Sequence, residues 1–374
     1  MFQNLGLTSL AVIPVLGFLI FVHELGHFLA ARWMGVKVLE FGFGYPPRLV
    51  KLFERNGVEY TLNWLPFGGF VRMAGEDGNF DSEGSLATVA PWRRMVVLFA
   101  GPFMNLLTAA VIFAVLLLAG TPQFVGDAAT LPVEILAISP GSPAEQSGLQ
   151  VGDVIESMNG QVVRGAEAVS AAIKANAGQE VAIVVHRQDE TLTIALTPRR
   201  PEETPEGQGA AGIQIGPVIP PEAITTVRSN PIEAVVGGVQ RTVFLIGQMF
   251  GGLGMLLRSA ISPAVDMPEG GVGGLVAIGR ITAEVAREGW KDLLNLTAFL
   301  SVNLAILNLL PIPALDGGRI MFALLEMVRR KRIPPEKEAM VHLAGFAVLI
   351  AFMVLITFVD VSNWLAGRPA LPGG

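Results

Sequence analysis

The amino-acid sequence predicts a polytopic α-helical membrane protein of about four transmembrane helices, with a re-entrant or cytoplasmic β-hairpin and one inserted α+β domain. Three observations support this fold class. The 374-residue chain is apolar, with mean hydropathy +0.54 and 16% charged residues, whereas an average soluble domain carries about 25%. Several long segments almost lack charge. A polar region rich in turn residues interrupts them.

The predicted spans are about Leu10–Met34, Met95–Ala119, Leu293–Leu310 and Met340–Val359. Each approaches or exceeds the roughly 20 helical residues that cross a bilayer core. Eight Lys and Arg residues lie between Arg32 and Arg94, and a second basic group separates the last two spans. Because cytoplasmic loops are enriched in Lys and Arg, both loops are predicted to be cytoplasmic. Both termini and the middle region are then extracytoplasmic.

The segment Ile232–Arg258 has two interpretations. Its Thr242–Leu257 part is nearly uncharged and is long enough for a fifth span, but polar residues punctuate the segment and glycines are frequent. These features favour a helix that lies at the membrane interface. We expect the interfacial position, because a fifth span would move Asp316 to the opposite membrane face from His23.

A β-hairpin is predicted between the first two spans. Arg48–Arg55 and Val58–Trp64 alternate in side-chain character around Asn56-Gly57, and Asn-Gly between alternating runs is the strongest short hairpin signal. The first membrane part thus covers residues 1–120. It holds the first helix, a hairpin within 36–72 and the second helix.

A separate soluble domain is predicted over residues 121–200. Ser142-Pro143-Ala144-Glu145-Gln146-Ser147-Gly148-Leu149, Gly152-Asp153-Val154-Ile155 and Asn159-Gly160 indicate a short helix, a tight turn and a strand that ends in a hairpin turn. These motifs resemble a PDZ domain of the bacterial protease-associated type. Residues 201–290 are predicted to form a linker and the interfacial helix, and residues 291–374 the second membrane part.

The first span carries His23-Glu24-Leu25-Gly26-His27. On a helix this pattern places two imidazoles four residues apart on one face, where both can bind one zinc ion, and Glu24 lies beside them to accept a proton from water. Ionisable residues at membrane depth are costly and rarely serve packing alone. The pattern therefore predicts a catalytic metal site.

A catalytic zinc needs a third protein ligand, and Asp316 is the best candidate. Cysteine is absent, and the remaining histidines, His186 and His342, belong to the inserted domain and the last span. Asp316 follows two prolines that end the third span. Like His27, it lies near the cytoplasmic end of its span, so two distant stretches place the candidate ligands in one membrane layer.

With these motifs, the chain resembles the site-2 protease family of bacterial intramembrane metalloproteases, of the regulator-of-sigma-E-protease type with one PDZ domain. His23-Glu24-x-x-His27, Asn308-x-x-Pro311-x-Pro313-x-Leu315-Asp316-Gly317 and Gly101-Pro102-x-x-Asn105 match family motifs. The resemblance implies that His23, His27 and Asp316 bind Zn²⁺ and that Glu24 is the general base. It also implies substrate contacts for Asn308 and Asn105, and a hairpin that offers a sheet edge to an unwound substrate.

The expected function is regulated intramembrane proteolysis by a zinc endopeptidase in a bacterial inner or plasma membrane. The active site would face the cytoplasm and the PDZ-like domain the outside. The resemblance implies single-pass substrates already cut by another protease, such as anti-sigma factors or signal-peptide remnants. A net charge of −6 gives no footprint for nucleic acid, and the lipid bilayer is the other expected partner. An inactive PDZ scaffold predicts a damaged metal motif, and a metal-ion transporter predicts ligands spread along a path.

Overall fold

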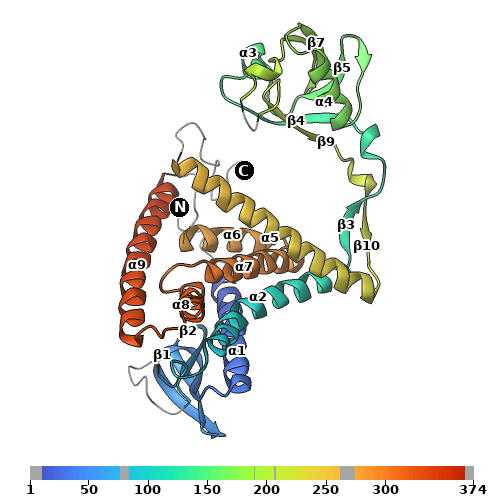
Figure 1. Cartoon of the computed structure of the whole chain (residues 1–374). Coiled ribbons are helices and arrows are strands. Elements are labelled where there is room, and N and C mark those ends of the chain that lie inside the picture. The colour runs from blue at the N-terminus through green and yellow to red at the C-terminus, as the bar shows by residue number, and fades with distance from the viewer. Residues whose placement is uncertain (1–10, 76–83, 189, 206–207, 262–273, 367–374) are drawn as a thin grey trace. The chain divides into compact units, whose positions relative to one another are not determined.

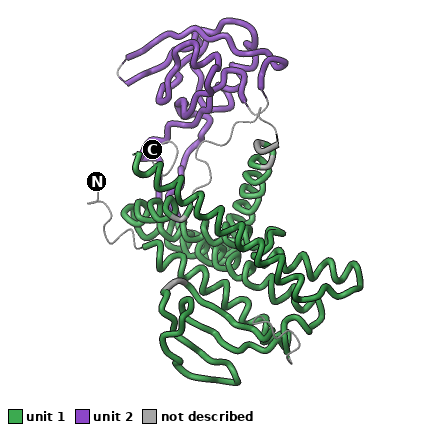
Figure 2. Tube along the Cα trace, turned by 90° about the vertical axis from the view of Figure 1, so that its left-hand side faces the viewer, with its two compact units in different colours: residues 1–120, 228–374 green, residues 121–227 purple. Residues whose placement is uncertain are grey.

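The computed structural model describes residues 11–75, 84–188, 190–205, 208–261 and 274–366 (Figure 1). The chain forms two compact units, residues 1–120 with 228–374 and residues 121–227 (Figure 2). The first unit contains the apolar helices and a β-sheet, and the second is a β domain inserted between α2 and α5.

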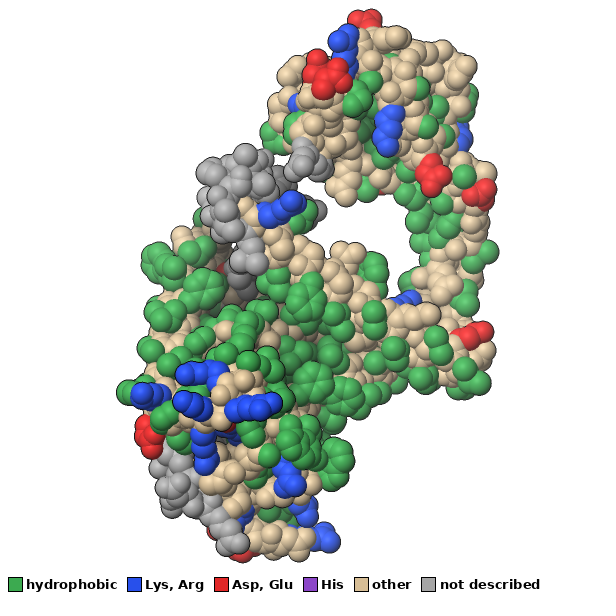
Figure 3. Space-filling model, in the orientation of Figure 1, with side chains coloured by type: hydrophobic (Ala, Val, Ile, Leu, Met, Phe, Trp, Pro, Cys, Tyr) green, Lys and Arg blue, Asp and Glu red, His purple; other side chains and the backbone are tan. Residues whose placement is uncertain are grey.

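Four helices of the first unit are long and apolar enough to cross a membrane: α1 (Val12–Met34), α2 (Pro91–Ala119), α7 (Trp290–Leu309) and α9 (Pro335–Leu365). They coincide with the four predicted spans. Hydrophobic side chains cover much of the visible face of this unit, and Lys and Arg side chains gather around the α8–α9 loop and the hairpin (Figure 3). The protein is a membrane protein.

In its described residues the unit has three further α-helices: α5 (Pro231–Ile261), α6 (Leu275–Glu288) and α8 (Asp316–Arg329). α5 packs along α2 and α7, with Gly238 so close to α2 that a Cβ there would lie 2.4 Å from the Ala110 carbonyl oxygen. α5 is not among the four candidate spans found in the described residues. Its interfacial position stays a prediction.

The close approach of α1 and α2 positions the histidines. A Cβ at Gly26 would lie 2.4 Å from the Ala100 carbonyl oxygen, so only glycine permits this helix contact. α1 ends at Gly35, which has the left-handed φ of 78° that favours glycine at a helix C-terminus. The neighbouring His23 and His27 are thereby held against α2.

The predicted hairpin is present, but it folds back on itself. β1 (Val38–Arg55) and β2 (Val58–Met73) meet at Asn56-Gly57, where both residues have positive φ as a tight hairpin turn requires. Phe41 pairs with Tyr60 on one side and with Val71 on the other. The order across the sheet is therefore 48–55, 58–65, 40–45 and 69–73, and the segment Gly69–Met73 lies at an edge.

The second unit contains a six-stranded sheet of order β8-β7-β5-β4-β9, with β6 added to β5. α3 (Pro143–Ser147) and α4 (Ala166–Ala175) accompany it. Buried aliphatic side chains from β4, β5, β7 and α4 form one core. The strands of this unit are β3 (Thr121–Phe124), β4 (Val133–Ile138), β5 (Val154–Met158), β6 (Gln161–Val162), β7 (Val181–Arg187), β8 (Glu190–Leu196), β9 (Ile213–Pro217) and β10 (Ile224–Val227).

The predicted end of this domain at residue 200 is too early. β9 pairs with β4, and β10 pairs with β3 at the entrance to the domain. Residues 213–227, predicted as linker, thus close the β domain. The polar stretch before β9 suggested a linker. The pairing of β9 with β4 is a long-range contact, which the composition of the segment does not reveal.

Candidate metal centre

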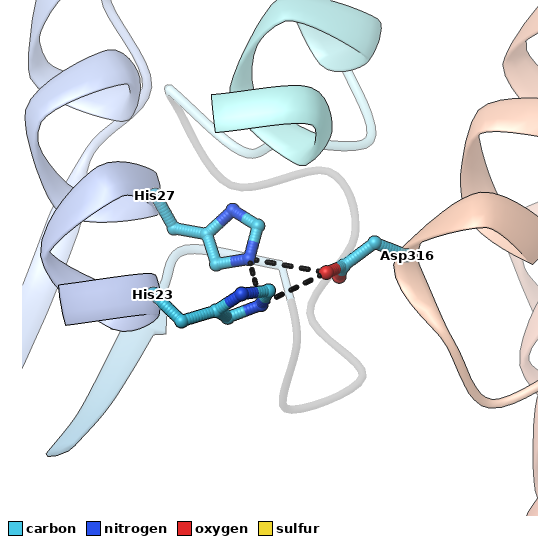
Figure 4. A group of neighbouring side chains, drawn as sticks. All are labelled: His23, His27 and Asp316. Carbon is cyan, nitrogen blue, oxygen red and sulfur yellow. Dashed lines mark hydrogen bonds and ion pairs between the residues drawn. The ribbon is translucent and has the colours of Figure 1, made fainter. Parts of the chain in front are cut away.

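The two histidines of α1 converge on one point. His23 and His27 lie one helical turn apart, and their Nε2 atoms are 3.1 Å from each other (Figure 4). Both side chains are buried, at 6% and 5% exposure. The spacing of four residues thus places two imidazole nitrogens at one site, as the sequence predicts.

Asp316 reaches the same point from a segment 293 residues away. Its Oδ2 lies 3.0 Å from His23 Nε2 and 3.3 Å from His27 Nε2. α7 ends at Leu309, two prolines follow, and Asp316 is the first residue of α8. Gly317 permits the tight turn, since a Cβ there would lie 2.2 Å from the Leu310 carbonyl oxygen.

Hydrogen bonds on the outer side of the rings orient both Nε2 atoms. His27 Nδ1–H donates to the Val97 carbonyl oxygen over 2.8 Å, so the lone pair of this ring is on Nε2. His23 Nδ1 lies 3.2 Å from the side-chain amide of Asn105. The Asn105 Oδ1 has no hydrogen-bond partner in the described part of the chain, and a half-turn of the amide would let it accept from His23 Nδ1–H.

With the Asn105 amide turned in this way, the centre brings together three atoms that accept: the two imidazole Nε2 atoms and a carboxylate oxygen. Such a cluster suits a metal cation. Ligands about 2.0 Å from a tetrahedral zinc ion lie roughly 3.3 Å apart, close to the 3.0–3.3 Å separations between these atoms. Among the described residues, this is the group whose ligand atoms come within 4.8 Å of one another. The donor set fits zinc.

Gly101 of α2 makes room for the centre. A Cβ at this position would lie 2.4 Å from His27 Nε2 and 2.8 Å from His23 Nε2. Any other residue would therefore fill the space between the two ligand atoms. The sequence contains Gly101 in the motif Gly101-Pro102-x-x-Asn105. The contact of Gly101 with both imidazoles, however, depends on how α2 packs against α1.

Glu24 and Asn308 line a cavity of about 340 Å³ that also exposes His23, His27 and Asp316. Asn105 does not reach this cavity, because its side chain is fully buried behind His23. The substrate contact expected for Asn105 stays a prediction.

Other residues of the cavity were not predicted. The sheet contributes Tyr45, Phe70, Val71 and Met73, and α8 contributes Arg319. Arg319 lies three residues after Asp316, which places both on one face of α8. That spacing was a usable signal, whereas nothing in the sequence shows which sheet residues reach the cavity.

The two remaining histidines lie away from the ligand cluster, as expected. His186 of β7 is paired with Glu156 at 3.0 Å on the surface of the β domain. His342 of α9 accepts a hydrogen bond from the Ala314 N–H over 2.9 Å. Neither belongs to the three-residue group.

Comparison with known proteins gives a consistent result. The model of peptidase family M50 matches residues 11–352. The "Putative zinc metalloprotease Cj1068" of Campylobacter jejuni is 33% identical over 95% of this chain and 93% of its own length. The "Regulator of sigma-W protease RasP" of Bacillus subtilis is 30% identical over 97% of this chain and 99% of its own length. The zinc metalloprotease RasP of Bacillus licheniformis is 31% identical over 95% and 99%, respectively.

The matched region includes both helices that carry the candidate ligands and the inserted β domain. The chain belongs to peptidase family M50, the site-2 proteases, and is a zinc metalloprotease.

Proposed function

We propose that this protein is an intramembrane endopeptidase that cuts the transmembrane segments of single-pass membrane proteins. The observation that carries the proposal is the meeting of His23, His27 and Asp316 beside Glu24 in a cavity between apolar helices. A scaffold without catalytic activity has no need of this arrangement.

In this proposal, His23, His27 and Asp316 hold the zinc ion. When bound, zinc supplies a Lewis acid that polarises the scissile carbonyl and makes water more acidic. Asn105 contacts a ligand and not the metal. It accepts from His23 Nδ1–H and so fixes the ring that binds the metal, a role typical of residues behind metal ligands.

Glu24 is proposed as the general base. Its carboxylate takes a proton from the attacking water while the water oxygen bonds to the scissile carbonyl carbon. The same carboxyl then gives this proton to the amide nitrogen as the carbon–nitrogen bond breaks. Such proton transfer contributes about 10²–10⁴-fold to the rate.

The edge segment Gly69–Met73 is the proposed docking strand. A helical substrate must unwind before its carbonyls are accessible, and pairing with a sheet edge stabilises the extended form. Phe70, Val71 and Met73 line the cavity, so this edge lies beside the ligands. The Asn56-Gly57 turn joins segments 48–55 and 58–65 on the other side of the sheet. The proposed edge therefore belongs to the same β-hairpin that was expected to offer an edge, but lies at its end away from this turn. Asn308, which also lines the cavity, is proposed to hold the substrate backbone.

The β domain is proposed to be a PDZ domain on the extracytoplasmic side, with the active site near the cytoplasmic side. A groove between α4 and β9 is lined by Ile173, Ile213 and Ile215 and suits an extended peptide. Anti-sigma factors or signal-peptide remnants, shortened beforehand by another protease, are the proposed substrates. The name of the Bacillus subtilis relative connects that protein with sigma-W, which supports an anti-sigma factor.

The test is cleavage of a shortened single-pass protein in membranes by wild type, Glu24→Gln and the control Glu284→Gln. Glu284 is exposed on α6. We expect Glu24→Gln to keep zinc but cut at least about 10²-fold more slowly, and the control to cut normally. Normal cleavage by a zinc-loaded Glu24→Gln protein would refute the assigned mechanism.

A further inference from the structure

The turn that presents Asp316 has an unusual backbone. Pro311 and Pro313 have no N–H to donate, and Ala314 has a φ of +82°, in the left-handed region that non-glycine residues rarely adopt. Such a conformation persists only when surrounding contacts hold it. Hydrogen bonds within the turn contribute, such as that from the Leu315 N–H to the Ile312 carbonyl oxygen, and so do the contacts of whatever packs against it.

The last helix supplies that contact. The Ala314 N–H donates to His342 Nδ1 of α9 over 2.9 Å. One turn further along α9, a Cβ at Gly345 would lie 2.3 Å from Pro313 Cβ and 2.8 Å from the Pro313 carbonyl oxygen. His342 and Gly345 are three residues apart and share a helix face. α9 thus contacts the turn at two positions: His342 provides a hydrogen-bond acceptor, and Gly345 has no side chain and so allows close approach.

The ring of His342 is itself held in place. Its side chain is 12% exposed, and it packs against Phe322 of α8 with ring centroids 5.6 Å apart. Because Nδ1 accepts from Ala314, the proton of the neutral ring is on Nε2. Nε2 has no hydrogen-bond partner among the described residues, and Glu338 Oε1, on the preceding turn of α9, lies 3.9 Å away.

We propose that His342 is a positioning residue: by accepting from the Ala314 N–H it holds the strained turn that brings Asp316 to the metal. The proposal rests on the proposed zinc ligands and adds a residue from the last span to the metal centre. His342 touches neither metal nor substrate. It acts through the backbone, two residues before the ligand.

The physical consequence is specific. Without an acceptor at position 342, the partly buried Ala314 N–H loses its partner, and the turn is free to relax toward negative φ. Asp316 then moves relative to His23 and His27, whose orientation is set by α1 and α2. Zinc affinity should fall while the fold persists.

The test compares zinc affinity in full-length His342→Leu, His342→Asn and Leu343→Ala proteins by competition with a chelator. Leucine removes the acceptor, whereas the asparagine Oδ1 replaces it. Leu343 is the neighbouring residue and is 70% exposed. We expect His342→Leu to bind zinc about 10–100-fold more weakly, as is usual when a residue behind a ligand is lost. His342→Asn should stay close to wild type, and Leu343→Ala should match it.

Thermal unfolding of the zinc-free proteins separates positioning from general stability. The wild type and these three variants should unfold at similar temperatures. Gly345→Ala provides a second variant if His342→Leu does not accumulate. Its new methyl group pushes on Pro313 while His342 stays intact, so zinc affinity should fall again. Wild-type zinc affinity in His342→Leu, or equal losses in the leucine and asparagine variants, would overturn the proposal. A wild-type protein that binds no zinc would instead refute the proposed ligands.

Discussion

Gly101→Ala should destroy the metal centre by adding one methyl group. Carbon and nitrogen atoms in contact lie about 3.5 Å apart, but the new Cβ would be 2.4 Å from His27 Nε2 and 2.8 Å from His23 Nε2. One or both rings would therefore have to retreat by roughly 0.7–1 Å. Metal–ligand distances tolerate only about 0.2 Å.

The rings have little freedom to adapt. His27 Nδ1 is bonded to the Val97 carbonyl oxygen, one turn before Gly101 on the same helix, so movement of the ring costs that hydrogen bond. We expect at least a 10–100-fold loss of zinc affinity, and cleavage should fall by about 10²-fold or more, as for a displacement of about 1 Å. The fold should not suffer, because alanine favours a helix over glycine by up to about 1 kcal/mol.

The assay is zinc content and chelator competition on purified protein, followed by membrane cleavage. Gly247→Ala is the matched control, because a Cβ at that helical position meets nothing within 4 Å. Full zinc occupancy and normal cleavage in Gly101→Ala would show that the two imidazoles do not bind the ion where the structure places them.

Three other predictions concern the metal centre, the β domain and the membrane orientation. Asn105→Leu should weaken zinc binding about 10–100-fold, whereas Asn105→Asp keeps an acceptor for His23 and should not; equal affinities would exclude this role. In the β domain, burial alone would raise the pKa of Asp153, but hydrogen bonds from Arg187 and a backbone N–H hold that pKa below its usual value. The pair thus stabilises the domain above the unfolded-state pKa of ~3.9 and loses this effect as pH falls through the lower folded value. Arg187→Gln should therefore destabilise the β domain near pH 7 but have little effect in strong acid, measured by hydrogen exchange of β7; a pH-independent difference would argue against it. A cysteine in place of Lys331, in a chain without cysteine, should resist an impermeant reagent added outside intact cells, and ready labelling would reverse the proposed orientation.

Local patterns were sufficient for the main elements. Four spans follow from the length and charge of each segment, and the structure has apolar helices at the same places. The Asn56-Gly57 turn follows from two residues that tolerate positive φ. The convergence of His23 and His27 follows from helical spacing alone. In each case the signal lies within one continuous segment of the chain, where backbone geometry limits the possible arrangements.

Long-range packing decided the rest. Sequence pattern made Asp316 a candidate ligand, but only the crossing of α1, α2 and α8 brings its carboxylate to the histidines. The same packing makes Asn105 a partner of His23. It also adds β9 to the inserted domain and makes Gly69–Met73 a sheet edge beside the cavity. Such contacts join residues tens to hundreds of positions apart, and a single sequence has no periodicity that records which surfaces meet.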